Sequence, residues 1–351
     1  MATNSRILRI ARVAKQLTQK ELAERLGVSQ GKIAKWEDGL LTPSDAEIDK
    51  LGESLECATA LFESGDEWQF ATCCLYHRKR VALPATLLST IHARVNLAGI
   101  GIGRMLQNVA MTSAIEYPTL DVDEYDGAQR VSQLLRTAWG IPPGPISSLV
   151  HFIEAAGGIV VPMDFETNLL DAVSLRPRGL RPLFFINSQS PTDRCRFTLA
   201  HELGHIVMHT IPSPNAEAEA DEFASEFLMP ASDISSDPDF AKFSLAKAAR
   251  MKVRWRTSMQ SLIMKAKSVG AITPRQHRSL FTQLSAAGYR KREPVRLEPE
   301  HPQTLGRLIS VHRNDLGYSE ADMAALTFCV SEEQFRSRFR GVTEHGLRVV
   351  G

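Results

Sequence analysis

The pentapeptide at residues 201–205, His-Glu-Leu-Gly-His, carries the residue types of a catalytic metal site. The surrounding residues follow a helical pattern, so His201 and His205 are predicted to lie one turn apart on the same helix face. Two imidazoles in this arrangement can hold a zinc ion, and Glu202 beside them can act as general base towards a bound water. The alternative is that His201 and His205 are core histidines bonded to other polar groups; Glu202 in register favours the metal site over it.

A catalytic zinc site usually offers three protein ligands and one open position, so a third ligand is needed. Three downstream residues are candidates: His209, Glu217 and Glu219. His209 continues the i+4 series, but a straight helix turns by about 80° over eight residues. Three histidines of one helix therefore cannot easily converge on one ion, and the two glutamates remain.

A second helix, predicted over residues 216–228, separates the two glutamates. At about 100° per residue, Glu217 lies on the apolar face of this helix. Glu219, Glu222 and Glu226 fall near the opposite side, which we expect to face solvent. A carboxylate on an apolar face needs a partner, because burying an unpaired charge is costly. Glu217 is therefore the predicted third ligand, with zinc as its partner.

Two further residues near the predicted site are interpreted as something other than metal ligands. Asp221 lies one turn after Glu217 and can accept a hydrogen bond from the free imidazole N–H of a ligating histidine. Cys195 is interpreted as a small packed residue rather than a fourth ligand. The five cysteines form no CxxC pair and are odd in number, which suits a reducing compartment and disfavours cysteine-ligated zinc.

The elements that must position these residues are a small sheet and the helix that follows it. Pro-Pro-Gly-Pro at 142–145 marks a break, followed by a short helix over 146–156. Three strands are predicted, and the last is a candidate for pairing with an extended substrate, although a buried core strand is equally consistent with it. The strands cover residues 159–161, 172–175 and 183–186. Ser-Pro-Thr-Asp at 190–193 is a helix start, which opens the helix that carries the histidines.

The N-terminal residues have the pattern of two short helices joined by a tight turn. Thr18 and Glu21 form a capping box, Gly27 ends the helix, and Ser29 can cap the next one. This is the plan of a helix-turn-helix, whose second helix enters the major groove of DNA. Polar side chains at the turn and on the outer face are predicted to contact bases or phosphates. They are Gln19, Ser29, Gln30, Lys32 and Lys35.

The segments Leu-Thr-Gln-Lys-Glu-Leu-Ala-Glu-Arg-Leu-Gly-Val-Ser at 17–29 and Ile-Ala-Lys-Trp-Glu-Asp-Gly at 33–39 resemble the phage-repressor (Cro/C1, XRE-type) helix-turn-helix family. The resemblance covers residues 5–62 and implies a double-stranded DNA operator as partner. A homodimer is expected, since reading two half-sites needs two recognition helices. A helical bundle that binds protein instead of DNA is the alternative.

A second resemblance concerns the predicted metal site. Residues 196–205, 217–224 and 227–230 resemble the ImmA/IrrE metallopeptidase family over residues 151–235. The resemblance implies a small zincin-like fold, with His201, His205 and Glu217 on Zn²⁺ and Glu202 as base. Asp221 is a departure, because many members have asparagine there. ImmA-like members cut phage-type repressors, and IrrE-like members cut a repressor of a stress regulon.

The remaining sequence has an uneven distribution of charge. Residues 211–240 hold eight acidic and no basic residues, whereas residues 241–292 hold thirteen basic and no acidic residues. Arg254, Arg256, Lys265 and Lys267 are expected to pair with the acidic segment or a partner rather than with DNA.

The sequence of residues 317–331 is similar to that of residues 17–29, which suggests a second helix-turn-helix-like unit. The basic cluster at 77–80 is interpreted as a solvated turn.

We therefore expect an α+β, mainly helical protein with four parts. These are a five-helix-type helix-turn-helix domain at 1–65, a helical connection at 66–145, a zincin-like core at 146–235 and a helical region at 236–351. The apolar fraction of 43% and the absence of a bilayer-length apolar stretch or secretory signal predict a cytoplasmic protein without a membrane partner.

The predicted function is a DNA-binding transcription regulator whose zinc-dependent endopeptidase domain cleaves a regulatory protein such as a repressor or antitoxin. The alternative is a regulator or antitoxin-like protein whose zincin core is a sensor or binding scaffold with little proteolysis.

Overall fold

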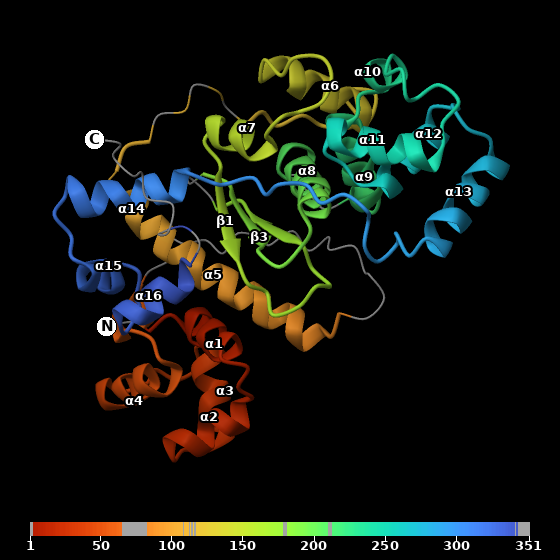
Figure 1. The fold of residues 1–351 in the computed structure, drawn as a ribbon. Helices are drawn as coiled ribbons and strands as arrows, with labels where there is room; N and C mark the ends of the chain where they lie inside the picture. The colour runs from red at the N-terminus through yellow and green to blue at the C-terminus, as the bar shows by residue number, and fades with distance from the viewer. Residues whose placement is uncertain are drawn as a thin grey trace.

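Figure 1 shows the computed structural model, which has a helical N-terminal domain, a long helix, a small central sheet and helices around it. It describes residues 3–64, 83–107, 109–111, 113, 115, 117–177, 181–209, 213–340 and 342. The predicted basic turn at 77–80 lies outside the described residues. The chain is α+β and mainly helical, as expected. Within the described ranges, no helix has both the length and the apolar character needed to cross a membrane.

Residues 3–64, the described part of the N-terminal domain, form four α-helices and a short 3-10 helix. Thr18 and Glu21 form the predicted capping box, and Gly27 ends the helix in the left-handed region at φ 68°. Ile33 and Trp36 are buried, as expected for the core-facing side of the second helix of the motif. The helices are α1 (Ser5–Ala14), α2 (Gln19–Leu26), α3 (Gln30–Glu37), α4 (Asp45–Leu55) and η1 (Thr59–Glu63).

Helix α5 (Ala85–Gln107) runs between the N-terminal domain and the sheet (Figure 1). It packs against α1 on one side and against the C-terminal helices on another. Gly101 permits a close approach, because a Cβ atom there would lie 3.1 Å from the Cβ of Thr327. The helix therefore joins the N-terminal domain to the rest of the molecule through buried contacts.

Among the described residues, the sheet has three strands in the order β1-β3-β2. β1 (Ile159–Met163) pairs with β3 (Leu183–Asn187) in parallel, and β2 (Ala172–Leu175) pairs with β3 in antiparallel. Of the two interpretations of residues 183–186, the structure therefore supports the buried core strand and contradicts substrate pairing at a sheet edge. β3 is the central strand, and its hydrogen-bonding groups are occupied by neighbours on both sides.

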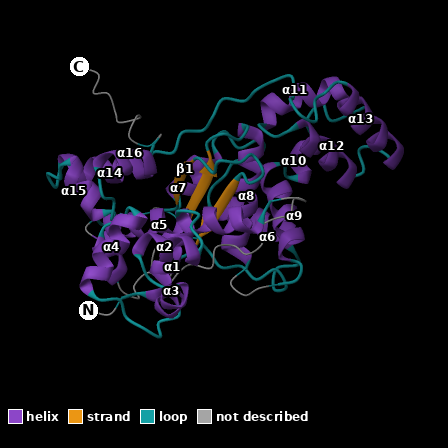
Figure 2. Cartoon of the chain, turned by 90° about the horizontal axis from the view of Figure 1, so that it is seen from below, coloured by secondary structure: helices purple, strands orange, loops and turns teal. Residues whose placement is uncertain are grey.

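Helices cover the sheet on both faces (Figure 2). Phe184 of β3 belongs to a core shared with the site helices, whereas Phe185 faces a core shared with α5 and the N-terminal domain. The helices on the Phe184 side are α6 (Ala128–Ala138), α7 (Leu149–Ala155), α8 (Thr192–Met208), α9 (Ala216–Leu228), α10 (Ala231–Ser235), α11 (Leu245–Trp255), α12 (Met259–Ser268) and α13 (Pro274–Ala286).

Three C-terminal helices return to the N-terminal side of the molecule (Figure 1). They are α14 (Thr304–Asn314), α15 (Glu320–Leu326) and α16 (Glu332–Arg338). Ser319 caps α15 and Ser331 caps α16, which repeats the capping pattern of α2 and α3. The backbone N–H of Ala58 donates to the carbonyl of Phe328 at 3.3 Å, so this unit touches the N-terminal domain directly. Its likeness to a second helix-turn-helix remains a prediction.

Candidate metal centre

The candidate site lies where α8 and α9 pack side by side. α8 begins after Pro191 with Asp193 in its first turn, and its second half carries the His-Glu-Leu-Gly-His pentapeptide. Gly204 allows the two helices to meet closely, since a Cβ atom there would lie 3.0 Å from Cδ1 of Phe223 on α9. This close contact brings the ligand candidates of the two helices together.

His201, His205 and Glu217 form a cluster whose possible ligand atoms all lie within 4.8 Å of one another. The two histidine Nε2 atoms are 3.0 Å apart, and Nε2 of His205 lies 3.2 Å from Oε1 of Glu217. Two imidazole nitrogens that both present lone pairs repel each other at this distance unless a proton or cation lies between them. Two imidazoles and one carboxylate are also a donor set that suits a catalytic zinc ion. The residues present therefore fit a metal.

The outward-facing nitrogens of both histidines have hydrogen-bond partners. Nδ1 of His201 lies 3.0 Å from Oδ1 of Asp221, which is the contact expected from the sequence. Nδ1 of His205 lies 2.8 Å from Nδ1 of His209, whose Nε2 lies 2.9 Å from Oε2 of Glu219. If both Nε2 atoms bind a metal, each Nδ1 carries the proton and donates it outwards. Both hydrogen bonds then run in the same direction: Nδ1–H of His205 donates to Nδ1 of His209, and Nε2–H of His209 donates to Glu219.

This arrangement gives His209 and Glu219 a place that the sequence did not predict. Both were considered as third ligands, yet both lie behind His205 in the described structure, as a chain of two hydrogen bonds. The i+4 spacing of His205 and His209 was the available signal, because side chains one turn apart on a helix are neighbours.

Glu202 is buried and held by the neighbouring edge strand of the sheet. Its Oε2 accepts hydrogen bonds from the backbone N–H of Ser174 at 3.1 Å and from the Ser174 hydroxyl at 2.6 Å. Burial lowers the pKa of His201, but its hydrogen bond to Asp221 and the nearby Glu202 carboxylate outweigh this effect, and the pKa is raised. The site therefore concentrates negative charge around its imidazoles.

The prediction for the faces of α9 needs correction. Glu226 was expected to face solvent, but it is buried and forms an ion pair with Lys265 at 2.6 Å. Helix α12 supplies this lysine and covers the side of α9 that a single-helix pattern assigns to solvent. Glu222 is exposed as expected, and Glu219 is partly buried. Glu217 is less buried than predicted, with 34% of its side chain exposed at the site.

The predicted DNA-contacting residues occupy different environments in the N-terminal domain. Gln30 and Lys35 are exposed on α3, and the Ser29 hydroxyl caps that helix. Lys32 forms an ion pair with Glu47 of α4.

The Gln19 side chain is bonded within the domain, because its amide donates a hydrogen bond to Oε2 of Glu37 at 2.9 Å. The buried ion pair beneath Gln19 was not predicted. Arg12 donates to both carboxylate oxygens of Glu37, at 2.5 and 2.8 Å. This pair joins α1 to α3 inside the domain.

Comparison with protein families bears on both ends of the chain. Residues 8–62 match the helix-turn-helix family, and residues 153–267 match the family described as IrrE N-terminal-like domain, a peptidase family. The chain joins a helix-turn-helix domain to an IrrE-like peptidase-family domain. No curated protein matches the chain.

The IrrE-like match contains the whole candidate metal centre. It also extends past the predicted resemblance, which ended at residue 235, and includes α11 and most of α12. Both helices contribute to the same apolar core as α9, and Lys265 of α12 pairs with Glu226 of α9. The helix-turn-helix match begins within α1 and runs through α4 into η1, and it supports DNA binding by this part of the chain.

Proposed function

We propose that this protein is a DNA-binding regulator whose IrrE-like domain is a zinc-dependent endopeptidase. Its substrate would be a regulatory protein, such as a repressor or an antitoxin, and the helix-turn-helix domain would bind an operator as a homodimer. The observation that supports the enzyme most strongly is the convergence of His201, His205 and Glu217 beside Glu202.

Each residue has a distinct part in the proposed reaction. His201, His205 and Glu217 would hold the zinc ion, which when bound polarises a carbonyl and acidifies a water molecule. Glu202 takes the proton from that water and passes it to the leaving amine. Ser174 fixes one carboxylate oxygen of Glu202 with two hydrogen bonds, which would orient the carboxylate for proton transfer.

The experiment that tests this function combines metal analysis with a cleavage assay. Purified full-length protein should contain stoichiometric zinc, and incubation with a repressor encoded by a neighbouring gene should yield a defined fragment. Glu202→Gln should keep the zinc and abolish the fragment. Glu222→Gln, an exposed change on α9, is the matched control and should cleave normally.

Two outcomes would contradict the proposal. Protein without bound zinc after purification in zinc-supplemented buffer would remove the metal-dependent mechanism. A fragment that forms equally with Glu202→Gln would show that this carboxylate is not the base. Stoichiometric zinc and operator binding without any fragment would support the binding-scaffold alternative instead.

A further inference from the structure

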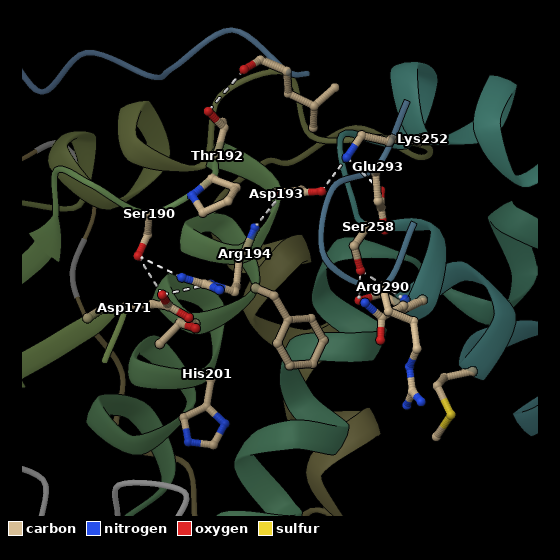
Figure 3. Close-up of a pocket in the computed structure, with 18 of the residues that line it drawn as sticks. Asp171, Ser190, Thr192, Asp193, Arg194, His201, Lys252, Ser258, Arg290 and Glu293 are labelled. Carbon is tan, nitrogen blue, oxygen red and sulfur yellow. Dashed lines mark hydrogen bonds and ion pairs between the residues drawn. The ribbon is translucent and has the colours of Figure 1, made fainter. Parts of the chain in front are cut away.

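A cleft of about 1120 Å³ opens beside the candidate metal centre. His201 and Glu202 line part of it, and residues 169–172 before and within β2 form the adjoining wall. The facing wall comes from α12, α13 and the connecting residues 289–299, which we call the strap. Figure 3 shows Arg290 and Glu293 of the strap across the cleft from Asp171 and Arg194.

Hydrogen bonds and an ion pair hold the strap against the IrrE-like domain, and the accepting groups are a carboxylate and a carbonyl of the strap. Glu293 accepts a hydrogen bond from the backbone N–H of Met259 at 2.9 Å and forms an ion pair with Lys252 at 2.7 Å. Further along, the carbonyl of Leu297 accepts from the hydroxyl of Thr192 at 3.0 Å. These contacts leave the basic side chains of the strap at the surface.

Four basic side chains of the strap are exposed and line the cleft. Within the ranges that the structure describes, the ion pairs of this part of the molecule are formed by other basic residues, namely Arg250, Lys252, Arg254 and Lys265. Arg290 lies over the ring of Phe281, with its guanidinium carbon 5.7 Å from the ring centre. The four residues are Arg290, Lys291, Arg292 and Arg296.

Some of the basic side chains on the helices before the strap form ion pairs within the protein. Arg254 forms an ion pair with Asp237, and Lys265 forms one with Glu226 at 2.6 Å. Two of the four basic residues expected to pair with the acidic segment at 211–240 therefore do so, whereas Arg256 donates to the carbonyl of Glu298 instead. At the cleft itself, the lining carboxylates of Asp171, Asp193 and Glu293 are paired with Arg194 and Lys252, whereas the basic side chains of the strap stand exposed at the rim.

The cleft also exposes large apolar side chains. Leu169 is 42% exposed on one wall and Met264 is 51% exposed on α12, and both line the cleft. Apolar side chains exposed in a concave site mark contact positions for apolar groups of a ligand. A ligand that matches this surface therefore carries both carboxylates and apolar side chains.

We propose that the cleft binds an extended protein segment rich in acidic residues, with its carboxylates on the strap and the bond to be cut at Glu202. This inference rests on the proposed endopeptidase function and adds the class of substrate. Charge complementarity sets the orientation of the segment and speeds its capture. Duplex DNA is the other common polyanion, but Leu169 and Met264 offer nothing to a phosphate backbone.

The test measures peptide binding to the full-length Glu202→Gln protein, in which no cleavage is expected. A labelled peptide of glutamate, leucine and glycine is compared by fluorescence anisotropy with one in which glutamine replaces glutamate. The acidic peptide should bind more tightly, and the preference should weaken as salt is raised. Arg292→Glu with Arg296→Glu should weaken its binding by about 10-fold and leave the glutamine peptide unchanged.

The matched control is Arg275→Glu with Arg278→Glu, which makes the same charge change on exposed positions of α13 outside the cleft. It should leave both affinities unchanged. Equal affinity for the two peptides, or an equal loss in the control, would overturn the proposal. Loss of binding to a labelled DNA duplex in the strap variant, with peptide binding retained, would make the strap a nucleic-acid contact instead.

Failure of this inference and failure of the proposed function give different results. Cleavage that depends on Glu202 but shows no acidic preference contradicts the substrate class alone. Acidic peptide binding that depends on the strap, without cleavage by the wild-type protein, contradicts the endopeptidase function alone.

Discussion

Replacing His209 by alanine should weaken zinc binding without changing the set of ligands. In the structure, Nδ1 of His209 lies 2.8 Å from Nδ1 of His205, and only 3% of the His209 side chain is exposed. The His205 side chain is 1% exposed, so water does not easily replace the missing partner. Removing the outer partner of a ligating histidine costs 10–100-fold in metal affinity, or about 1.4–2.7 kcal/mol.

The burial of this pair places His209→Ala near the upper end of that range, at about 100-fold. Glu219→Gln acts one bond further from His205 and should cost about 10-fold or less. His209→Asn should recover part of the loss, because its side-chain oxygen can accept the proton of His205. His151→Ala, a change at an exposed histidine of α7, is the control and should leave zinc affinity unchanged.

The assay is a competition titration of the full-length proteins against a chromophoric zinc chelator, with circular dichroism to confirm that each variant is folded. Folded His209→Ala protein that binds zinc within twofold of wild type would refute the positioning role. Complete loss of zinc in His209→Ala, with zinc retained in Glu217→Ala, would instead make His209 the third ligand.

Three further predictions follow from the described contacts. Glu217→Ala should lose stoichiometric zinc and Glu219→Ala should retain it when both are measured by elemental analysis, and the reverse result would exchange their roles. Ser174→Ala should lower kcat about 10-fold with little change in KM, because it releases the oriented Glu202 carboxylate; an unchanged kcat would deny Ser174 any part in orienting the base. Glu37→Ala leaves Arg12 buried without its partner and should destabilise the N-terminal domain by about 3–5 kcal/mol in thermal unfolding, whereas a loss below about 1 kcal/mol would show that water replaces the partner.

The parts of the site that the sequence predicts depend on positions within single helices. His201 and His205 share a face of α8, and Glu217 and Asp221 lie one turn apart on α9, because helical spacing fixes which side chains share a face. Ser174 could not be found in this way, because it meets Glu202 only through the packing of β2 against α8. The spacing of residues within a helix says nothing about which strand will cover it.

The same limit explains the predictions that were wrong. A helical pattern places Glu226 on the outer side of α9, but it cannot show that α12 later brings Lys265 against that side. The order of the strands depends on a crossover, so the central position of β3 was not visible in the sequence of residues 183–186. The N-terminal domain was predicted more completely, because its capping residues Thr18 and Ser29 act on their own helices.

The position of α5 has a consequence for how the two ends of this protein respond to their ligands. One continuous apolar core contains residues of the N-terminal domain, α5, the Phe185 face of the sheet and the C-terminal helices. The DNA-reading helices and the peptidase-family fold are therefore not tethered modules that tumble independently. If an operator alters the affinity for metal or substrate by some factor through this core, thermodynamic linkage requires metal or substrate to alter operator affinity by the same factor.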